Sequence, residues 1–222
     1  MRLSLFSYPV SGTKMSHEPS RQIYTDKANH LRLTVKTQLV PFFFPILQKG
    51  FTQKIKVGCS LMTLLSDQFG LSAEYIENKI QTIFLNGKPI DDMDTVTVRD
   101  GSSLAVSSAM PGLLGATLRR GGYYSRMRSQ ITHVEETESS QQTDGQIIVK
   151  LFNLTIRELG PMFLERGIWI DAEDLKDFFE SQSHDFRVGC VEAKVDGRNV
   201  EMAKIMAWDF TARQVYLQLQ TA

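Results

Sequence analysis

Apolar and polar residues alternate along two early segments of the chain, residues 31–36 and 52–57. A period of two places every second side chain on the same face, so both segments predict half-buried β-strands. Between them, Phe42, Phe43 and Phe44 lie between two prolines, which predicts a loop. We consider two roles for these phenylalanines, filling the core beneath a hairpin or forming an exposed contact patch.

A helical period follows the second strand. Ser60 is placed to cap a helix in which apolar residues recur every three or four positions, and Gly70 is suited to end it. Ser72 predicts the start of a second, shorter helix. Residues 82–85 then predict a strand closed by an Asn-Gly turn, and residues 104–106 predict a final strand after an Asp-Gly turn.

This order of elements, a hairpin, a helix, a strand, a short strand and a final strand, is typical of the β-grasp fold. The most specific segments are residues 84–90 (FLNGKPI) and residues 98–106 (VRDGSSLAV). They resemble the ubiquitin-like sulfur carriers, which include the small subunit of molybdopterin synthase and the thiamine sulfur carrier. The resemblance covers roughly residues 31–122 and implies a β-grasp domain.

A diglycine, Gly121-Gly122, follows Leu118, Arg119 and Arg120, and this segment resembles the end of ubiquitin. In the carrier family the diglycine is the chain terminus, and its carboxylate is adenylated. Here the chain continues to residue 222, so carrier chemistry would require cleavage after Gly122. The partner would then be an adenylating or sulfur-transfer enzyme. The alternative is that the diglycine is a hinge in a long connector.

The segment around the diglycine is basic and aromatic. Guanidinium groups beside aromatic rings suit a phosphate or nucleic-acid ligand. The alternative is a connector that docks on the acidic C-terminal module. Residues 1–133 hold 16 Lys+Arg and 9 Asp+Glu, whereas residues 134–222 hold 9 and 16, which supports either interpretation. The arginines in question are Arg119, Arg120, Arg126 and Arg128.

The C-terminal part predicts a second α+β module. Residues 135–146 contain no Leu, Val, Ile or Phe and predict a linker, and a strand is expected at residues 147–151. Thr155 and Glu158 form a capping-box pattern for a helix that we expect to break near Gly160-Pro161. A helix capped by Asp171 and an antiparallel meander over residues 186–219 complete the module. No internal repeat relates the two parts of the sequence.

The predicted fold class is therefore α+β, with an N-terminal ubiquitin-like β-grasp domain followed by a second small α+β domain with an antiparallel meander. The expected organisation is given by four ranges. They are a mobile tail at residues 1–30, the β-grasp domain at 31–110, an Arg/Gly connector and acidic linker at 111–145, and the acidic domain at 146–222. Either Met1 or Met15 serves as the start of translation.

Composition and motif content narrow the function classes. Cys59 and Cys190 are too few for a four-thiolate metal site, and they suit a reducing compartment. Cys59 is placed either as a thiolate at a helix N-terminus or as a buried structural thiol. The four histidines lack metal-ligand spacing, and no phosphate-binding glycine loop or nucleophile motif occurs. We expect no enzyme activity, no cofactor and no metal.

The longest apolar run has nine residues, too few to cross a bilayer, and no signal-peptide cleavage site follows residue 9. We therefore expect a cytoplasmic protein with no membrane partner. The first hypothesis for its role is a non-catalytic protein–protein interaction protein whose contact surfaces are Phe42–Phe44 and the connector. The alternatives are a latent sulfur carrier or protein modifier released by cleavage after Gly122, and an RNA-associated β-grasp module that uses the arginines.

Overall fold

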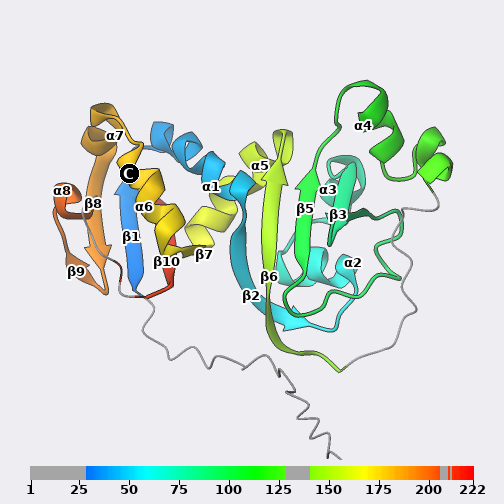
Figure 1. Ribbon diagram of the computed structural model, residues 1–222, viewed down its shortest axis with the longest axis horizontal. Helices are drawn as coiled ribbons and strands as arrows, with labels where there is room; N and C mark the ends of the chain where they lie inside the picture. Colours follow the sequence, from blue (N-terminus) through cyan, green and yellow to red (C-terminus); the bar gives the residue numbers. More distant parts are fainter. Residues whose placement is uncertain (1–28, 129–140, 206–209, 211) are drawn as a thin grey trace, which may run out of the picture.

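The computed structural model describes residues 29–128, 141–205, 210 and 212–222. Helices and one mixed sheet of ten strands make up these residues, which confirms the α+β class (Figure 1). The strands are β1 (His30–Val35), β2 (Phe51–Val57), β3 (Thr82–Leu85), β4 (Lys88–Pro89), β5 (Ser103–Ser107), β6 (Thr143–Phe152), β7 (Ile168–Asp171), β8 (Cys190–Val195), β9 (Arg198–Asn199) and β10 (Gln214–Thr221). Their order across the sheet is β4-β3-β5-β6-β2-β7-β10-β1-β8-β9.

The helices are short except for two on the second part of the chain. They are η1 (Thr37–Phe43), α1 (Phe44–Lys49), α2 (Leu61–Thr63), the π-helical turn η2 (Leu64–Gln68), α3 (Ala73–Asn78), α4 (Gly112–Leu118), η3 (Tyr123–Arg128), α5 (Leu154–Arg166), α6 (Ala172–Glu180), α7 (His184–Gly189) and α8 (Met202–Ile205). As predicted, the Ser60 and Ser72 hydroxyls accept backbone N–H groups at the starts of α2 and α3. Of the described residues, no helix is long and apolar enough to cross a membrane.

The predicted hairpin between the first two strands is wrong. β1 pairs in parallel with β10 and antiparallel with β8, whereas β2 pairs with β6 and touches β7 at one position. Alternation correctly identified both strands, but it carries no information about the partner. Residues 40–45, predicted as a loop, belong to η1 and α1, which carry the chain from one strand to the other.

Strand β6 lies between β2 and β5, although it follows them far along the chain. It begins at Thr143, so the last residues of the predicted linker belong to the sheet. The strands therefore do not separate at residues 111–145: β1 lies among the strands of the C-terminal part, and β6 lies among those of the N-terminal part. Residues 1–28 of the predicted tail and residues 129–140 of the predicted linker lie outside the described residues.

The sheet consists of two halves with the same pairings. Going outward from β2, the neighbour β6 is antiparallel, β5 is parallel to β6, and β3 and β4 are each antiparallel. Going outward from β7, the strands β10, β1, β8 and β9 repeat this order. The halves meet at Thr52 and Trp169. The absence of a sequence repeat therefore does not prevent a repeated arrangement of strands.

The core lies between one face of the sheet and the helices. Leu31, Leu33 and Val35 of β1 are fully buried, and the aromatic rings of Phe51 on β2 and Phe163 on α5 pack 5.2 Å apart. Figure 1 shows α6 crossing in front of β1 and β10 on this face. The alternate positions of the same strands carry polar side chains that are exposed or half-exposed.

Helix α5 is unbroken through Gly160-Pro161, contrary to the predicted break. Gly160 allows close packing, because a Cβ at this position would lie 2.9 Å from Leu47 Cδ1. The next residue, Pro161, has no backbone N–H to donate, and the helix is continuous here without that hydrogen bond. Thr155 does not form the predicted capping box; its hydroxyl lies 3.0 Å from the carbonyl oxygen of Val106 and 2.6 Å from that of Phe152.

The predicted meander is also wrong. Residues 184–189 form α7, whose N-terminus is capped by the Ser183 hydroxyl, and residues 202–205 form α8. β8 and β9 do form a hairpin, with positive φ angles at Asp196 and Gly197 in its turn. β10, however, pairs with β7 and β1 instead of continuing from β9. Apolar residues such as Phe186 suited a strand as well as a buried helix turn.

Candidate contact surfaces

Residues 111–128 form a compact helical hairpin, made of α4 and η3, which we call the connector hairpin. It lies at the end of the molecule beyond β3 and β5 (Figure 1). Gly115 lets α4 pack closely against the segment that enters the hairpin, because a Cβ there would lie 2.0 Å from the Met110 carbonyl oxygen. Gly121 has a φ of +63° in the turn between the helices, and the Gly122 N–H donates to Arg119 O at 3.2 Å.

Arg120 attaches this turn to the neighbouring helix α3. Its backbone N–H donates to Gln81 O at 2.8 Å, and its guanidinium donates to Ile76 O at 3.0 Å. The same guanidinium lies 3.4 Å from a carboxylate oxygen of Glu77, and the Arg120 side chain is only 12% exposed. Arg120 therefore holds the hairpin to the protein and does not present its charge to solvent.

Arg128 has a similar role at the end of η3. Its Nε donates to Thr117 O at 2.7 Å, and its Nη2 lies 2.6 Å from Asp91 Oδ1. Asp91 Oδ1 also accepts the Gly121 N–H at 3.3 Å. The Arg128 side chain is 4% exposed and that of Asp91 is 33% exposed, so the guanidinium is largely removed from water while the carboxylate keeps some contact with it. A buried arginine is tolerated when its donors are satisfied in this way.

The predicted group of four arginines is therefore divided by the structure. Arg120 and Arg128 face inward, Arg119 is exposed, and Arg126 lies within η3. The Gly121-Gly122 pair forms a fixed turn against Asp91 rather than part of an extended connector.

Several large apolar side chains of the connector hairpin are exposed. Leu113 is 73% exposed, Leu114 is 66% exposed and Tyr123 is 87% exposed. The Tyr124 ring packs edge-on against Tyr123, with 5.2 Å between ring centroids. Large apolar side chains gathered on a rigid projection are typical of a contact surface.

Cleavage after Gly122 would have a structural consequence for a released carrier. β6 begins 20 residues or more beyond that bond and lies between β5 and β2. A peptide that ended at Gly122 would leave this strand behind. The edges of β5 and β2 that β6 now covers would then lose their hydrogen-bond partners.

The three phenylalanines of the Phe42–Phe44 segment have different environments. Phe43 is fully buried, with ring centroids 5.0 Å from Phe178 and 5.6 Å from Phe186. Phe42 is 42% exposed and also packs against Phe186, while Phe44 is partly buried. The core role therefore applies to Phe43, and only Phe42 presents a large exposed surface.

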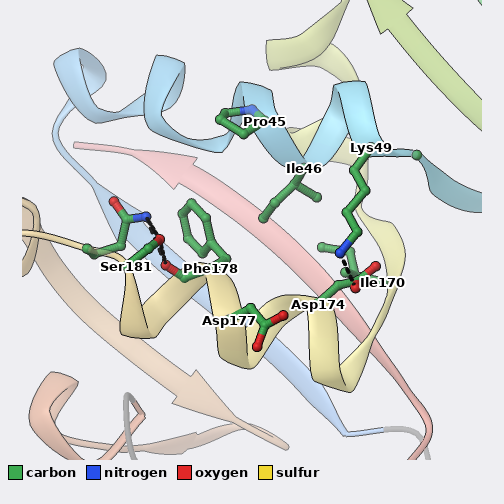
Figure 2. Close-up of a pocket in the computed structure, with 10 residues that line it drawn as sticks. Pro45, Ile46, Lys49, Ile170, Asp174, Asp177, Phe178 and Ser181 are labelled. Carbon is green, nitrogen blue, oxygen red and sulfur yellow. Dashed lines mark hydrogen bonds and ion pairs between the residues drawn. The ribbon is translucent and has the colours of Figure 1, made fainter.

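A groove of about 260 Å³ lies beside this segment, between α1 and α6. Figure 2 shows Ile46 and Phe178 facing each other across it, with Ile170 to one side next to Lys49 and Asp174. The three apolar side chains are at least nine-tenths buried. Its lining is therefore largely apolar, with room for an aliphatic side chain of a ligand or partner.

The rim of the groove is charged. Lys49 Nζ lies 2.5 Å from Asp174 Oδ1 at one end (Figure 2). The hydrogen bond and the charge of Asp174 raise the pKa of Lys49, so Lys49 is charged at neutral pH. Asp177 is exposed on the same rim and makes no ion pair with any residue that the structure describes. The groove thus suits an apolar side chain that has a cationic neighbour.

Both thiols are structural in character. Cys59 is buried, and its Sγ lies 3.4 Å from the Lys56 carbonyl oxygen. Burial raises the pKa of Cys59, and it raises the pKa of Cys190 to about 11. Both shifts oppose a reactive thiolate at neutral pH. Within the ranges that the structure describes, no three His, Cys, Asp or Glu side chains gather as a metal site.

Two features of these surfaces were missed by sequence reasoning. Leu113 and Leu114 look like ordinary core residues, because their exposure depends on the position of the hairpin. The groove needs α1, whose first two residues, Phe44 and Pro45, were predicted as the end of a loop. The sequence signal that could have indicated the groove was the apolar side of α6, which includes Phe178.

Comparison of the chain with protein-family models, curated proteins and solved structures found no match.

Proposed function

We propose that this protein is a non-catalytic protein–protein interaction protein and that the connector hairpin is its principal contact surface. The observation that supports this proposal best is the exposure of Leu113, Leu114 and Tyr123 on a hairpin held in place by buried arginines. Rigid apolar side chains bind a partner with little loss of conformational entropy, because they are already ordered.

The exposed apolar side chains of this surface would contribute favourable energy when a partner covers them. Burying a leucine side chain fully contributes about 1.5–3 kcal/mol, and an aromatic anchor contributes a similar amount. Because Leu113 is 73% and Leu114 is 66% exposed, covering both by a partner contributes about 2–4 kcal/mol. Arg119 is an exposed cation of the segment and makes no ion pair within the described residues. An acidic group on the partner next to an apolar pocket would complement it.

A modified β-grasp arrangement is also part of the proposal. β6 and β2 form an antiparallel pair in space, and the chain then runs through α2, η2 and α3 to β3, the short β4 and the final β5. This succession matches the β-grasp order if β6 takes the place of the first strand. The β7 half has a corresponding order, with β10 in that place and β1 as the final strand. We propose two interleaved β-grasp units.

The experiment is affinity capture from cells of the native host with the tagged full-length protein. The test variant carries Leu113→Glu and Leu114→Glu, and the matched control carries Val191→Glu at another exposed apolar position, 59% exposed on β8. We expect the wild type and the control to capture the same protein, and the test variant to lose it by about 100-fold or more. Equal capture by all three proteins would overturn the role of the hairpin.

A further inference from the structure

The open face of the sheet carries a row of aromatic rings across three adjacent strands. Trp169 on β7 lies opposite Tyr216 on β10, and Tyr216 lies in register with His30 on β1. The ring centroids are 5.1 Å apart for Trp169 and Tyr216 and 5.0 Å apart for Tyr216 and His30. We call these three residues the aromatic row. It is placed at the middle of the ten-strand sheet.

Cations flank the aromatic row on the same face. Lys54 Nζ lies 4.1 Å from the centroid of the Trp169 ring, which is a cation–π contact. On the other side, Arg32 lies in register with Gln218 and Lys194, next to the aromatic row. A hollow of about 230 Å³, lined in part by His30, Arg32, Lys194 and Tyr216, opens between the aromatic rings and these cations.

One acid near this face is paired with a cation and another is hydrogen-bonded to neutral donors. Glu192 pairs with Lys194 at 2.9 Å, and the Asp196 carboxylate accepts the His30 backbone N–H at 2.8 Å and an Asn29 amide N–H at 3.1 Å. By contrast, Lys54 and Arg32 make no ion pair with any residue that the structure describes. Lys194 and Glu192 balance each other, whereas Asp196 keeps its negative charge because its donors are neutral. With Lys54 and Arg32 counted, the charge beside the aromatic row remains positive in sum.

We propose that the aromatic row and its flanking cations bind single-stranded nucleic acid. Bases stack on aromatic side chains regardless of sequence, and the phosphates lie along cations at the edges of such a surface. An open sheet face with aromatic residues on adjacent strands is suited to this arrangement, whereas a duplex keeps its base faces covered. The surface is separate from the connector hairpin and does not use Arg119 or Arg126.

The test uses the full-length protein and two fluorescent probes, a 15-nucleotide oligo(U) and a 15-base-pair duplex, at about 50 mM salt. The chain has two tryptophans, so Trp208→Phe makes Trp169 the sole reporter. We expect the single strand to bind more tightly than the duplex and to quench the Trp169 fluorescence. No binding of the single strand, or binding without quenching and without preference over the duplex, would overturn the proposal.

Variants test whether the proposed residues are the ones that bind the single strand. Trp169→Ala should weaken single-strand binding about tenfold or more, provided that circular dichroism shows a folded protein. Lys54→Ala combined with Arg32→Ala removes two exposed cations from the face and should reduce the slope of log K against log salt by about 1.4. Lys176→Ala, an exposed cation on α6, is the matched control and should change neither the affinity nor the slope. An unchanged slope in the double variant would also overturn the proposal.

Discussion

Arg128 shows how a residue that suggests ligand binding can instead serve the fold. Its guanidinium is 4% exposed and contacts Asp91 and the backbone of Thr117 and Arg119. Removing one member of a buried ion pair leaves the other charge without compensation. An arginine in a basic segment therefore indicates ligand binding only when its side chain is known to be exposed.

Arg128→Met should loosen the connector hairpin while the rest of the sheet remains folded. We expect a loss of stability of about 1–3 kcal/mol, because the Asp91 carboxylate and the Thr117 carbonyl oxygen lose a charged donor while Asp91 keeps contact with water. Hydrogen exchange over residues 111–128 measures this directly, and it should become faster in the variant. Arg119→Met is the matched control at an exposed position and should leave exchange unchanged. Equal protection in both variants would contradict a holding role for Arg128.

Cys190 leads to a prediction about pH. Its pKa is raised from 9.0 to about 11 by burial, so the folded state disfavours the thiolate. The contribution is fully present below pH 9 and is lost as the pH rises toward 11, because the unfolded chain ionises first. Urea unfolding should show the wild type losing more stability than Cys190→Ala between about pH 8 and about pH 10.5. Parallel losses in the two proteins would contradict the shift.

At the scale of elements, the diglycine turn is a rigid part of a hairpin. Gly121 has a φ of +63°, a conformation that costs an L-residue about 1 kcal/mol or more. Gly122 is outside the positive-φ region, and a Cβ there would meet the Arg119 carbonyl oxygen at 3.2 Å, a tight contact that a small shift of the turn relieves. Gly121→Ala should therefore lower the thermal midpoint by several degrees, and Gly122→Ala should lower it less. Differential scanning fluorimetry measures both. A larger effect of Gly122→Ala would contradict the assigned turn.

Local patterns predicted most strands and the starts of two helices. Leu31 and Ile55 lie on alternating segments, and Ser60 and Ser72 cap the expected helices. These features depend on neighbouring residues, which is why a single sequence reveals them. The pairing of β1 with β10 depends on residues about 180 positions apart, and no local pattern encodes it.

The candidate surfaces were less predictable than the strands. The sequence identified the connector and Phe42–Phe44, but burial divides each of them into inward and outward side chains. Apolar Leu113 and polar Arg128 have environments opposite to their usual preference, because the hairpin projects from the sheet and folds back on its own arginine. An exposed leucine and a buried arginine of this kind depend on tertiary structure, and they occur at contact surfaces.

At the scale of the whole molecule, each half of the sheet takes one strand from the other part of the chain. β1 lies between β10 and β8, and β6 lies between β5 and β2. Neither part can form its half of the sheet alone, so the two halves are expected to fold as one unit. This interleaving places the connector hairpin and the aromatic row on one common scaffold.

Splitting the chain tests this interleaving. Residues 1–128 and 129–222, expressed together as separate polypeptides, should copurify as a one-to-one complex. Each polypeptide alone should aggregate, because β5 and β2 or β10 and β8 would have unpaired edges. Size-exclusion chromatography with light scattering measures the result. Two separately folded monomers would contradict the interleaved sheet.

The most direct test of the account is photo-crosslinking of the connector hairpin inside the native host. A benzophenone amino acid replaces Leu113 in one strain and Val191 in a control strain, both at exposed apolar positions. The account predicts a discrete protein adduct from position 113 that is absent at position 191 and disappears when Leu114→Glu is added. No adduct at position 113, or the same adducts at both positions, would contradict a protein-contact role for the hairpin.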